Sequence, residues 1–70
     1  MAKIHTYEVF KSGSVRVCDV RETCIIKACM AFAKTLHKPI SYKTEGTEYA
    51  TMRYKDSGTI RNNFVVMLKE

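Results

Sequence analysis

Residues 19–38 read DVRETCIIKACMAFAKTLHK and carry the helical pattern of the chain. Apolar side chains recur in this segment at intervals of four, three and four residues, at Ile25, Cys29, Phe32 and Leu36. This is the spacing of a helical stripe that faces a hydrophobic core. We therefore expect one amphipathic helix here.

Both ends of this helix have sequence signals. Asp19 followed by Glu22 matches a capping box, in which each side chain accepts a hydrogen bond from a free backbone N–H of the first turn. Pro39 disfavours helical geometry in the residue before it and has no N–H to donate. The pattern predicts a helix that begins near Val20 and ends by Lys38.

The predicted helix is apolar over a wide arc. Ile26 and Met30 extend the stripe beyond what packing on one sheet requires, which favours a second contact with another copy of the chain or with another protein. The remaining polar face is narrow, and its charged residues are Lys27, Lys34 and Lys38. Such lysines are ordinarily solubilising side chains, and the alternative is a ridge that contacts phosphates.

Alternating apolar and polar residues predict strands on both sides of the helix. The N-terminal part predicts a hairpin over residues 3–18, with its turn at residues 11–14. After Pro39 the strands are predicted at residues 40–44, 49–55 and 59–69, and Asn62-Asn63 forms a bulge in the last strand or shortens it. The order β-β-α-β-β-β predicts one α+β domain, in which one helix packs on one face of an antiparallel sheet of four to five strands.

The same alternation predicts which side chains lie on the sheet face away from the helix. The apolar centre of that face is expected at Tyr49, Val65 and Met67. Cationic side chains are expected around it, at Lys43, Arg53, Lys55, Arg61 and Lys69. A strand slip of one residue would reverse each of these assignments.

Composition limits the classes of protein. Seventy residues, 46% of them hydrophobic, suffice for one core and leave no room for a second domain. Twelve Lys and Arg against seven Asp and Glu give a formal net charge of +5, which favours acidic partners, nucleic acid among them. The apolar runs are far shorter than the roughly 20 residues of a membrane span, and the N-terminus lacks a secretory signal. We expect a cytoplasmic protein without a membrane segment.

The sequence offers few candidates for catalysis. Three cysteines without a Cys-x-x-Cys pair predict reduced thiols, not a disulfide framework or a zinc knuckle. The two histidines, His5 and His37, lie apart from any metal-ligand spacing, and the isolated glycines form no phosphate-binding loop. We therefore expect no enzymatic activity, no catalytic residue, no metal, no cofactor and no small-molecule substrate.

Two functions remain open. The first is a non-catalytic protein-binding module, either a homodimer or an inhibitor that covers a surface of a larger assembly, because the chain has more exposed apolar positions than one small core uses. The alternative is direct nucleic-acid binding, with bases stacked on sheet tyrosines and basic side chains along the backbone. The residues predicted to contact either partner are Lys27, Lys34, Lys38, Tyr49, Arg53, Lys55 and Arg61.

In size, element order and lack of catalytic motifs, the chain resembles the small inhibitors that phages use against host defences, of which the anti-CRISPR proteins are the best-known group. The resemblance covers the whole chain as architecture. It implies that the protein sterically blocks a large nucleic-acid-handling complex of the host defence. Side chains such as Lys27, Lys34, Arg53 and Lys55 would then meet the partner. With a net charge of +5 the chain is unsuited to the DNA mimicry of acidic members.

Overall fold

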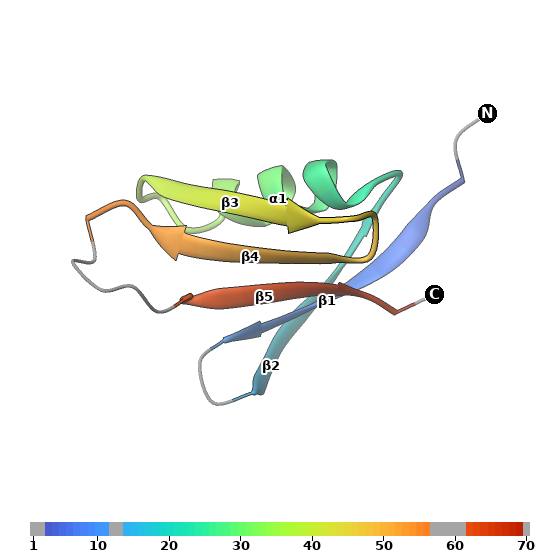
Figure 1. Cartoon of the computed structure of the whole chain (residues 1–70), viewed down its shortest axis with the longest axis horizontal. Helices are drawn as coiled ribbons and strands as arrows, with labels where there is room; N and C mark the ends of the chain where they lie inside the picture. Colours follow the sequence, from blue (N-terminus) through green and yellow to red (C-terminus); the bar gives the residue numbers. More distant parts are fainter. Residues whose placement is uncertain (1–2, 12–13, 57–61, 70) are drawn as a thin grey trace.

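The computed structural model describes residues 3–11, 14–56 and 62–69, and in these it contains one five-stranded antiparallel sheet and one helix (Figure 1). The predicted α+β class and the order β-β-α-β-β-β are confirmed. The elements are β1 (His5–Lys11), β2 (Val15–Glu22), α1 (Ile25–Lys34), β3 (Ile40–Glu45), β4 (Tyr49–Tyr54) and β5 (Phe64–Leu68).

The last strand in the sequence is the central strand of the sheet. The spatial order is β2-β1-β5-β4-β3, so β5 joins the β1–β2 hairpin to the β3–β4 hairpin. Val66 lies opposite Val9 of β1 on one side and Ala50 of β4 on the other. The segment Phe64–Leu68 is apolar on both faces: Phe64, Val66 and Leu68 pack at the core, and Val65 and Met67 lie on the other face. Figure 1 shows β3, β4 and β5 side by side, whereas β1 and β2 cross them steeply, as the twist of the sheet requires.

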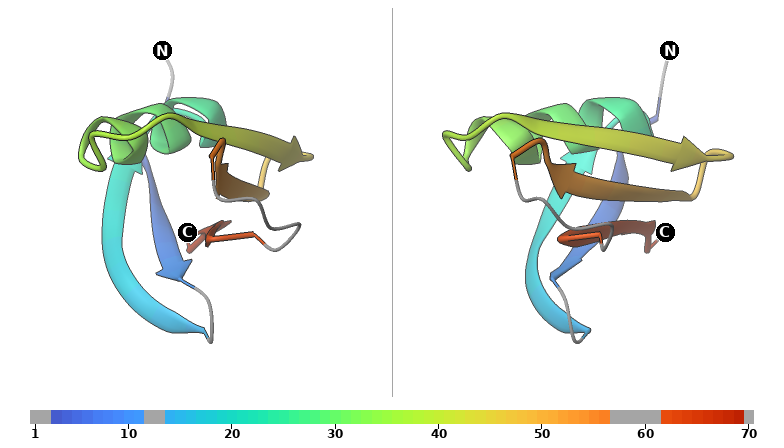
Figure 2. Two further views of the ribbon diagram at one scale, coloured as in Figure 1. Left: turned by 90° about the vertical axis from the view of Figure 1, so that its left-hand side faces the viewer. Right: turned by 60° about the vertical axis from the view of Figure 1, so that its left-hand side comes forward.

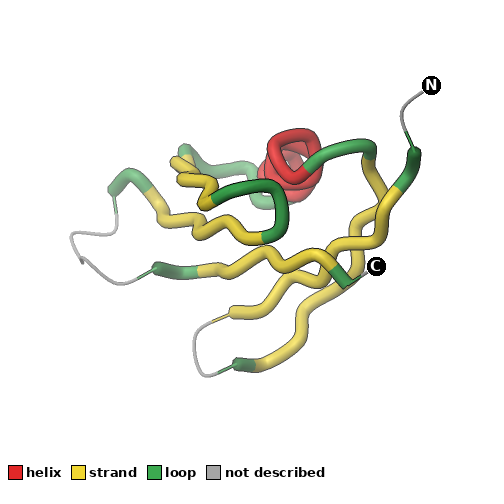
Figure 3. The backbone as a smooth tube through the Cα atoms, turned by 45° about the vertical axis from the view of Figure 1, so that its right-hand side comes forward, coloured by secondary structure: helices red, strands yellow, loops and turns green. Residues whose placement is uncertain are grey.

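Helix α1 lies across one face of this sheet (Figures 2 and 3). The predicted stripe is confirmed for Ile25, Cys29 and Phe32, which are buried, and Leu36 packs against the core from beyond the helix end. The Phe32 and Phe64 rings meet edge to face with centroids 4.9 Å apart. The core residues are Tyr7, Val9, Ile25, Ala28, Cys29, Phe32, Ala50, Met52 and Val66.

The predicted start of the helix is wrong. Strand β2 continues to Glu22, which lies opposite His5, and α1 begins only at Ile25. Asp19 lies opposite Glu8 within the sheet, and its carboxylate binds Arg16 instead of capping a helix. A capping box stabilises a helix by about 1 kcal/mol, which is less than a run of ladder hydrogen bonds with a neighbouring strand. The residue at the N-cap is Cys24, and no side chain forms a cap hydrogen bond there.

The predicted end of the helix at Lys38 is also too late. Helix α1 ends at Lys34, and Thr35 is its C-cap, with its hydroxyl donating to the Phe32 carbonyl oxygen at 2.7 Å. His37 then adopts a φ of 56°, in the left-handed region, which does not continue a right-handed helix.

The predicted strands are found, with changes at their ends. The register of the first hairpin shifts between Val9 and Phe10, so that Val17 of β2 is the extra residue of a bulge. The last strand is shorter than residues 59–69, since Asn63 lies outside it and its backbone N–H donates to the Met52 carbonyl oxygen. Residues 12–13 of the first predicted turn and residues 57–61 lie outside the described residues.

Candidate functional site

The sheet face away from α1 is not covered by another element in the described part of the chain. Residues directly opposite each other in an antiparallel pair point to the same face, so the register places two rows of side chains across it. One row consists of Asp19, Glu8, Met67, Tyr49 and Glu45, and the next of Arg16, Phe10, Val65, Thr51 and Lys43. We call this surface, together with Arg53 opposite Ser41, the open face. The prediction that Tyr49, Arg53, Val65 and Met67 lie on this side is confirmed.

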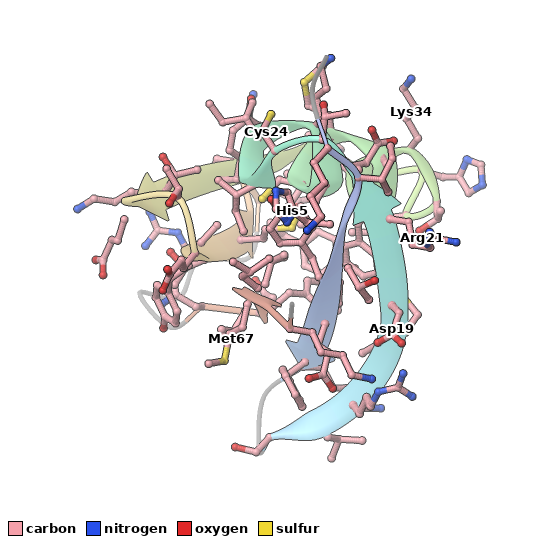
Figure 4. All side chains as sticks on the ribbon, turned by 90° about the vertical axis from the view of Figure 1, so that its right-hand side faces the viewer. His5, Asp19, Arg21, Cys24, Lys34 and Met67 are labelled. Atoms are coloured by element: carbon pink, nitrogen blue, oxygen red, sulfur yellow. The ribbon has the colours of Figure 1, made fainter. Side chains whose placement is uncertain are left out.

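The middle of the open face is apolar. Phe10 and Val65 are half-buried, and Met67 is 44% exposed. Figure 4 shows the Met67 side chain pointing away from the helix. These three side chains, with Lys11, Ser14 and the two asparagines 62 and 63, line a hollow of about 280 Å³. A hollow of this size has room for one side chain of a partner.

On the β1–β2 side of the open face, the charges are paired with each other. The Arg16 guanidinium contacts the Asp19 carboxylate at 2.6 Å and the Glu8 carboxylate at 3.4 Å. The Lys69 ammonium lies 3.8 Å from the second oxygen of Asp19. Hydrogen bonding to Asp19 raises the pKa of Arg16 above its ordinary value. Arg16 and Lys69 are therefore neutralised by the protein itself, whereas Arg21, opposite Thr6 on the same face, is exposed and forms no ion pair with a described residue.

On the β3–β4 side, the cations have no such partners. Lys43 and Arg53 are exposed, and neither forms an ion pair with a described residue. They line a shallow hollow at this edge of the sheet together with Ser41, Tyr42, Thr51 and Asn62. Unpaired positive charge on the open face thus lies at Lys43 and Arg53 on this side and at Arg21 near the end of β2.

The outer surface of α1 carries two of the three predicted lysines. Lys27 and Lys34 are exposed, lie about 10 Å apart along the helix axis, and border a shallow hollow floored by Met30 and Ala31. Figure 4 shows Lys34 projecting away from the sheet. Ile26 and Met30 are also exposed, at 46% and 47%. The wide apolar arc of the helix is therefore only partly used by the core.

Lys38 does not belong to this helical surface. It follows the end of α1, and its ammonium lies 5.6 Å from the centre of the Tyr54 ring. The interpretation of three lysines as one helical ridge is therefore wrong, because the helix ends at Lys34.

The seven predicted contact residues do not form one surface. Tyr49 and Arg53 lie on the open face, whereas Lys27 and Lys34 lie on the helix, across the sheet from them. Lys55 follows β4, and its backbone N–H donates to the Pro39 carbonyl oxygen. Arg61 lies outside the described residues.

Several residues of the open face were not singled out from the sequence. Phe10 lines the apolar hollow, and Glu8 and Asp19 hold the basic side chains of the β1–β2 side. Period-two alternation from Glu8 to Phe10 indicates a shared face. The ion pairs depend on the bulge in β2, which has no local sequence signal.

The described residues offer little for catalysis or metal binding. Burial raises the pKa of Cys18 above its ordinary value and that of Cys29 to about 11, so neither is a thiolate at neutral pH. No group of three or more His, Cys, Asp or Glu side chains in residues 3–11, 14–56 and 62–69 is arranged to hold a metal ion. No helix in these residues is both long and apolar enough to cross a membrane.

Comparisons of the chain with protein-family models, with curated proteins and with solved structures give no match. The functional interpretation therefore depends on the surfaces described above.

Proposed function

We propose that the protein is a non-catalytic binding module that places the open face of its sheet against an acidic surface of a protein partner. The observation that carries this proposal is the arrangement of that face: an uncovered apolar centre with the unpaired cations Lys43 and Arg53 beside it.

The apolar centre supports a protein partner. Protein interfaces combine an apolar middle with a polar rim, and methionine and aromatic side chains are enriched in them. Met67, Val65 and Phe10 form such a middle, and charged side chains surround it on the same face. The hollow beside Met67 offers a place for one anchoring side chain.

The charge distribution supports an acidic partner. Lys43 and Arg53 lie on the same face as the apolar centre and form no ion pair with a described residue. Cations of this kind increase the association rate with acidic surfaces and disfavour basic ones. The formal net charge of +5 acts in the same direction over longer distances.

Direct nucleic-acid binding is the second candidate, because Tyr49 shares the open face with Arg53 and Lys43. One feature of the same face supports it less. Tyr49 is half-buried, which limits the ring area on which a base could stack.

The inhibitory mode is part of the proposal. A chain of seventy residues that covers an acidic functional surface of a larger nucleic-acid-handling complex would block that surface sterically. This mode is also what the resemblance to phage anti-defence inhibitors implies.

The test compares two double charge reversals that alter the net charge equally. Lys43→Glu with Arg53→Glu changes the open face, and Lys27→Glu with Lys34→Glu changes the helix. The probes are a fluorescent peptide of alternating acidic and large apolar residues, and single- and double-stranded oligonucleotides, at about 50 and 200 mM salt. Amide chemical shifts would locate the bound peptide.

We expect the peptide to perturb the amides of β4 and β5, and the open-face reversal to weaken its binding by at least about tenfold. The helix reversal should weaken it much less. Equal losses in both variants would contradict the proposal, because net charge alone would then explain binding. Tight, steeply salt-dependent binding of an oligonucleotide without peptide binding would favour the second candidate. A dimeric mass that the Met67→Glu variant reduces to a monomer would assign the face to self-association instead.

A further inference from the structure

A second concavity lies on the opposite side of the molecule from the open face, at the N-terminal end of α1. It has a volume of about 390 Å³, within the roughly 300–1,000 Å³ typical of small-molecule sites. Four segments line it: the start of β1, the first turn of α1, the β3–β4 turn and Leu68 of β5. Figure 4 shows His5 and Cys24 at this end of the helix.

The first turn of α1 leaves backbone donors without a side-chain partner. Cys24 is the N-cap and makes no side-chain cap hydrogen bond, and no acidic residue lies in the first turn. The first N–H groups of a helix have no acceptor within the helix, and they carry the positive end of its dipole. Residues 23–26, which form this end, line the cavity.

Tyr7 supplies a second, independent donor. Its side chain is only 2% exposed, and its hydroxyl makes no hydrogen bond to a described residue. Every fully enclosed side-chain nitrogen or oxygen of the described residues has a hydrogen-bond partner. Since the Tyr7 hydroxyl has no such partner, it is not fully enclosed and borders open space. The open space that Tyr7 lines is this cavity. Burial, and to a lesser extent Cys24, raise the pKa of Tyr7 above its ordinary value, so the phenol is protonated and can donate.

The rest of the lining defines the chemistry of a ligand. It contains hydroxyl groups and one imidazole, from Thr23, Thr47 and His5, but no carboxylate. Ile25, Ile26 and Leu68 form an apolar wall next to these donors. A ligand with an anionic head and an apolar body would satisfy both parts.

We propose that this cavity binds a small organic carboxylate, whose anionic group accepts hydrogen bonds from the first turn of α1 and from Tyr7, and whose apolar body contacts Ile25, Ile26 and Leu68. Helix N-termini bind anions in this way when the bound group can approach the free N–H groups. The site is separate from the open face and does not depend on the function proposed for that face.

The experiment titrates the whole chain with hexanoate, acetate and hexanamide. Amide chemical shifts report the position of binding, and the alkylation rate of Cys24 by iodoacetamide reports occupancy, since Cys24 is exposed while Cys18 is half-buried and Cys29 is buried. We expect hexanoate to shift the amides of Ile25 and Ile26 and to slow alkylation. Acetate and hexanamide should each bind at least about tenfold more weakly, because each lacks one half of the ligand.

Three variants test the role of the helix end and of Tyr7. Cys24→Asp places a carboxylate at the N-cap, so it should abolish hexanoate binding while it raises the melting temperature. Cys24→Asn is the matched neutral cap; it should also raise the melting temperature but retain weakened binding. Tyr7→Phe keeps the ring in the core and should lower hexanoate affinity several-fold, with its folding checked by circular dichroism.

Three results would overturn the proposal. Equal binding of hexanoate and hexanamide would show that the cavity does not recognise the anion. Unchanged hexanoate binding by a folded Cys24→Asp variant would show that the helix end is not involved. Absence of any chemical-shift change in residues 23–26 at millimolar hexanoate would show that the cavity is not a carboxylate site.

Discussion

The two hairpins of the sheet differ in what their basic side chains contact. On β1–β2, the Arg16 guanidinium binds Glu8 and Asp19, and Asp19 also holds Lys69 from the end of β5. On β3–β4, Lys43 and Arg53 lie on the same sheet face without an ion pair to a described residue. A net charge of +5 therefore does not locate the charge available to a partner. The strand register places Glu8 and Asp19 beside Arg16, whereas Arg21 of β2, like Lys43 and Arg53, forms no ion pair with a described residue.

The largest expected effect comes from separating the two hairpins. Val66 is fully buried between Val9 of one hairpin and Ala50 of the other, so Val66→Asp places an unpaired carboxylate in the core. We expect a loss of about 3–5 kcal/mol, enough to unfold a domain of this size. Val65→Asp is the matched control on the open face and should retain a cooperative thermal transition by circular dichroism. Equal melting temperatures would contradict the central role of β5.

High pH should weaken the helix that packs against both hairpins. Cys29 of α1 is fully buried, and burial raises the pKa of its thiol from 9.0 to about 11. The folded state therefore holds this proton more tightly than the unfolded state. Its contribution of about 3 kcal/mol is complete below about pH 9 and is lost as the pH rises toward about 11. The free energy of unfolding, measured in urea across this pH range, should fall less steeply with pH in Cys29→Ala than in the unchanged protein. If it falls equally steeply with pH in both proteins, the Cys29 thiol is not the group responsible.

A single substitution should free part of the positive charge on the β1–β2 side. Asp19→Asn removes the charged partner of Lys69 and the closer of the two carboxylates that bind Arg16, while Glu8 stays 3.4 Å from Arg16. The free energy of unfolding should change by less than about 1 kcal/mol, because these ion pairs are partly exposed. Binding of the acidic peptide should become a few-fold tighter. Asp56→Asn alters the net charge equally in an exposed turn, and an equal gain in that variant would show that pairing on the open face has no special role.

The smallest expected effect concerns a cation beside the β3–β4 hairpin. The Lys38 ammonium lies 5.6 Å from the Tyr54 ring centre, so Lys38→Gln should cost about 0.5–1 kcal/mol of unfolding free energy. Lys55→Gln is the control, since Lys55 is exposed and stacks on no described ring. If chemical denaturation shows equal midpoints for the two variants, the Lys38–Tyr54 contact contributes nothing.

Much of the fold was predictable from local patterns. Periodicity among residues close in the sequence predicts the positions of β3 and β4. It also predicts the buried stripe at Ile25, Cys29 and Phe32. The helix start was not predictable in this way. Asp19 and Glu22 form a valid capping signal, but β1 offers residues 18–22 backbone partners, and these partners lie nine to seventeen residues away in the sequence.

The residues of the candidate sites also fall into a predictable and an unpredictable group. Alternation places Tyr49, Arg53 and Met67 on one face, because a strand turns successive side chains to opposite sides. It does not place Phe10 beside Val65, or Tyr7 beside the first turn of α1, since these contacts join segments far apart in the chain.

Periodicity and composition established one helix, a set of short strands and an excess of positive charge, because each of these depends on neighbours in the sequence. The insertion of β5 between the hairpins, the neutralisation of Arg16 and Lys69, and the cavity at the N-terminus of α1 arose only on folding. Pairing of strands is a competition among distant segments for the same backbone groups, and its outcome depends on the geometry of the whole sheet.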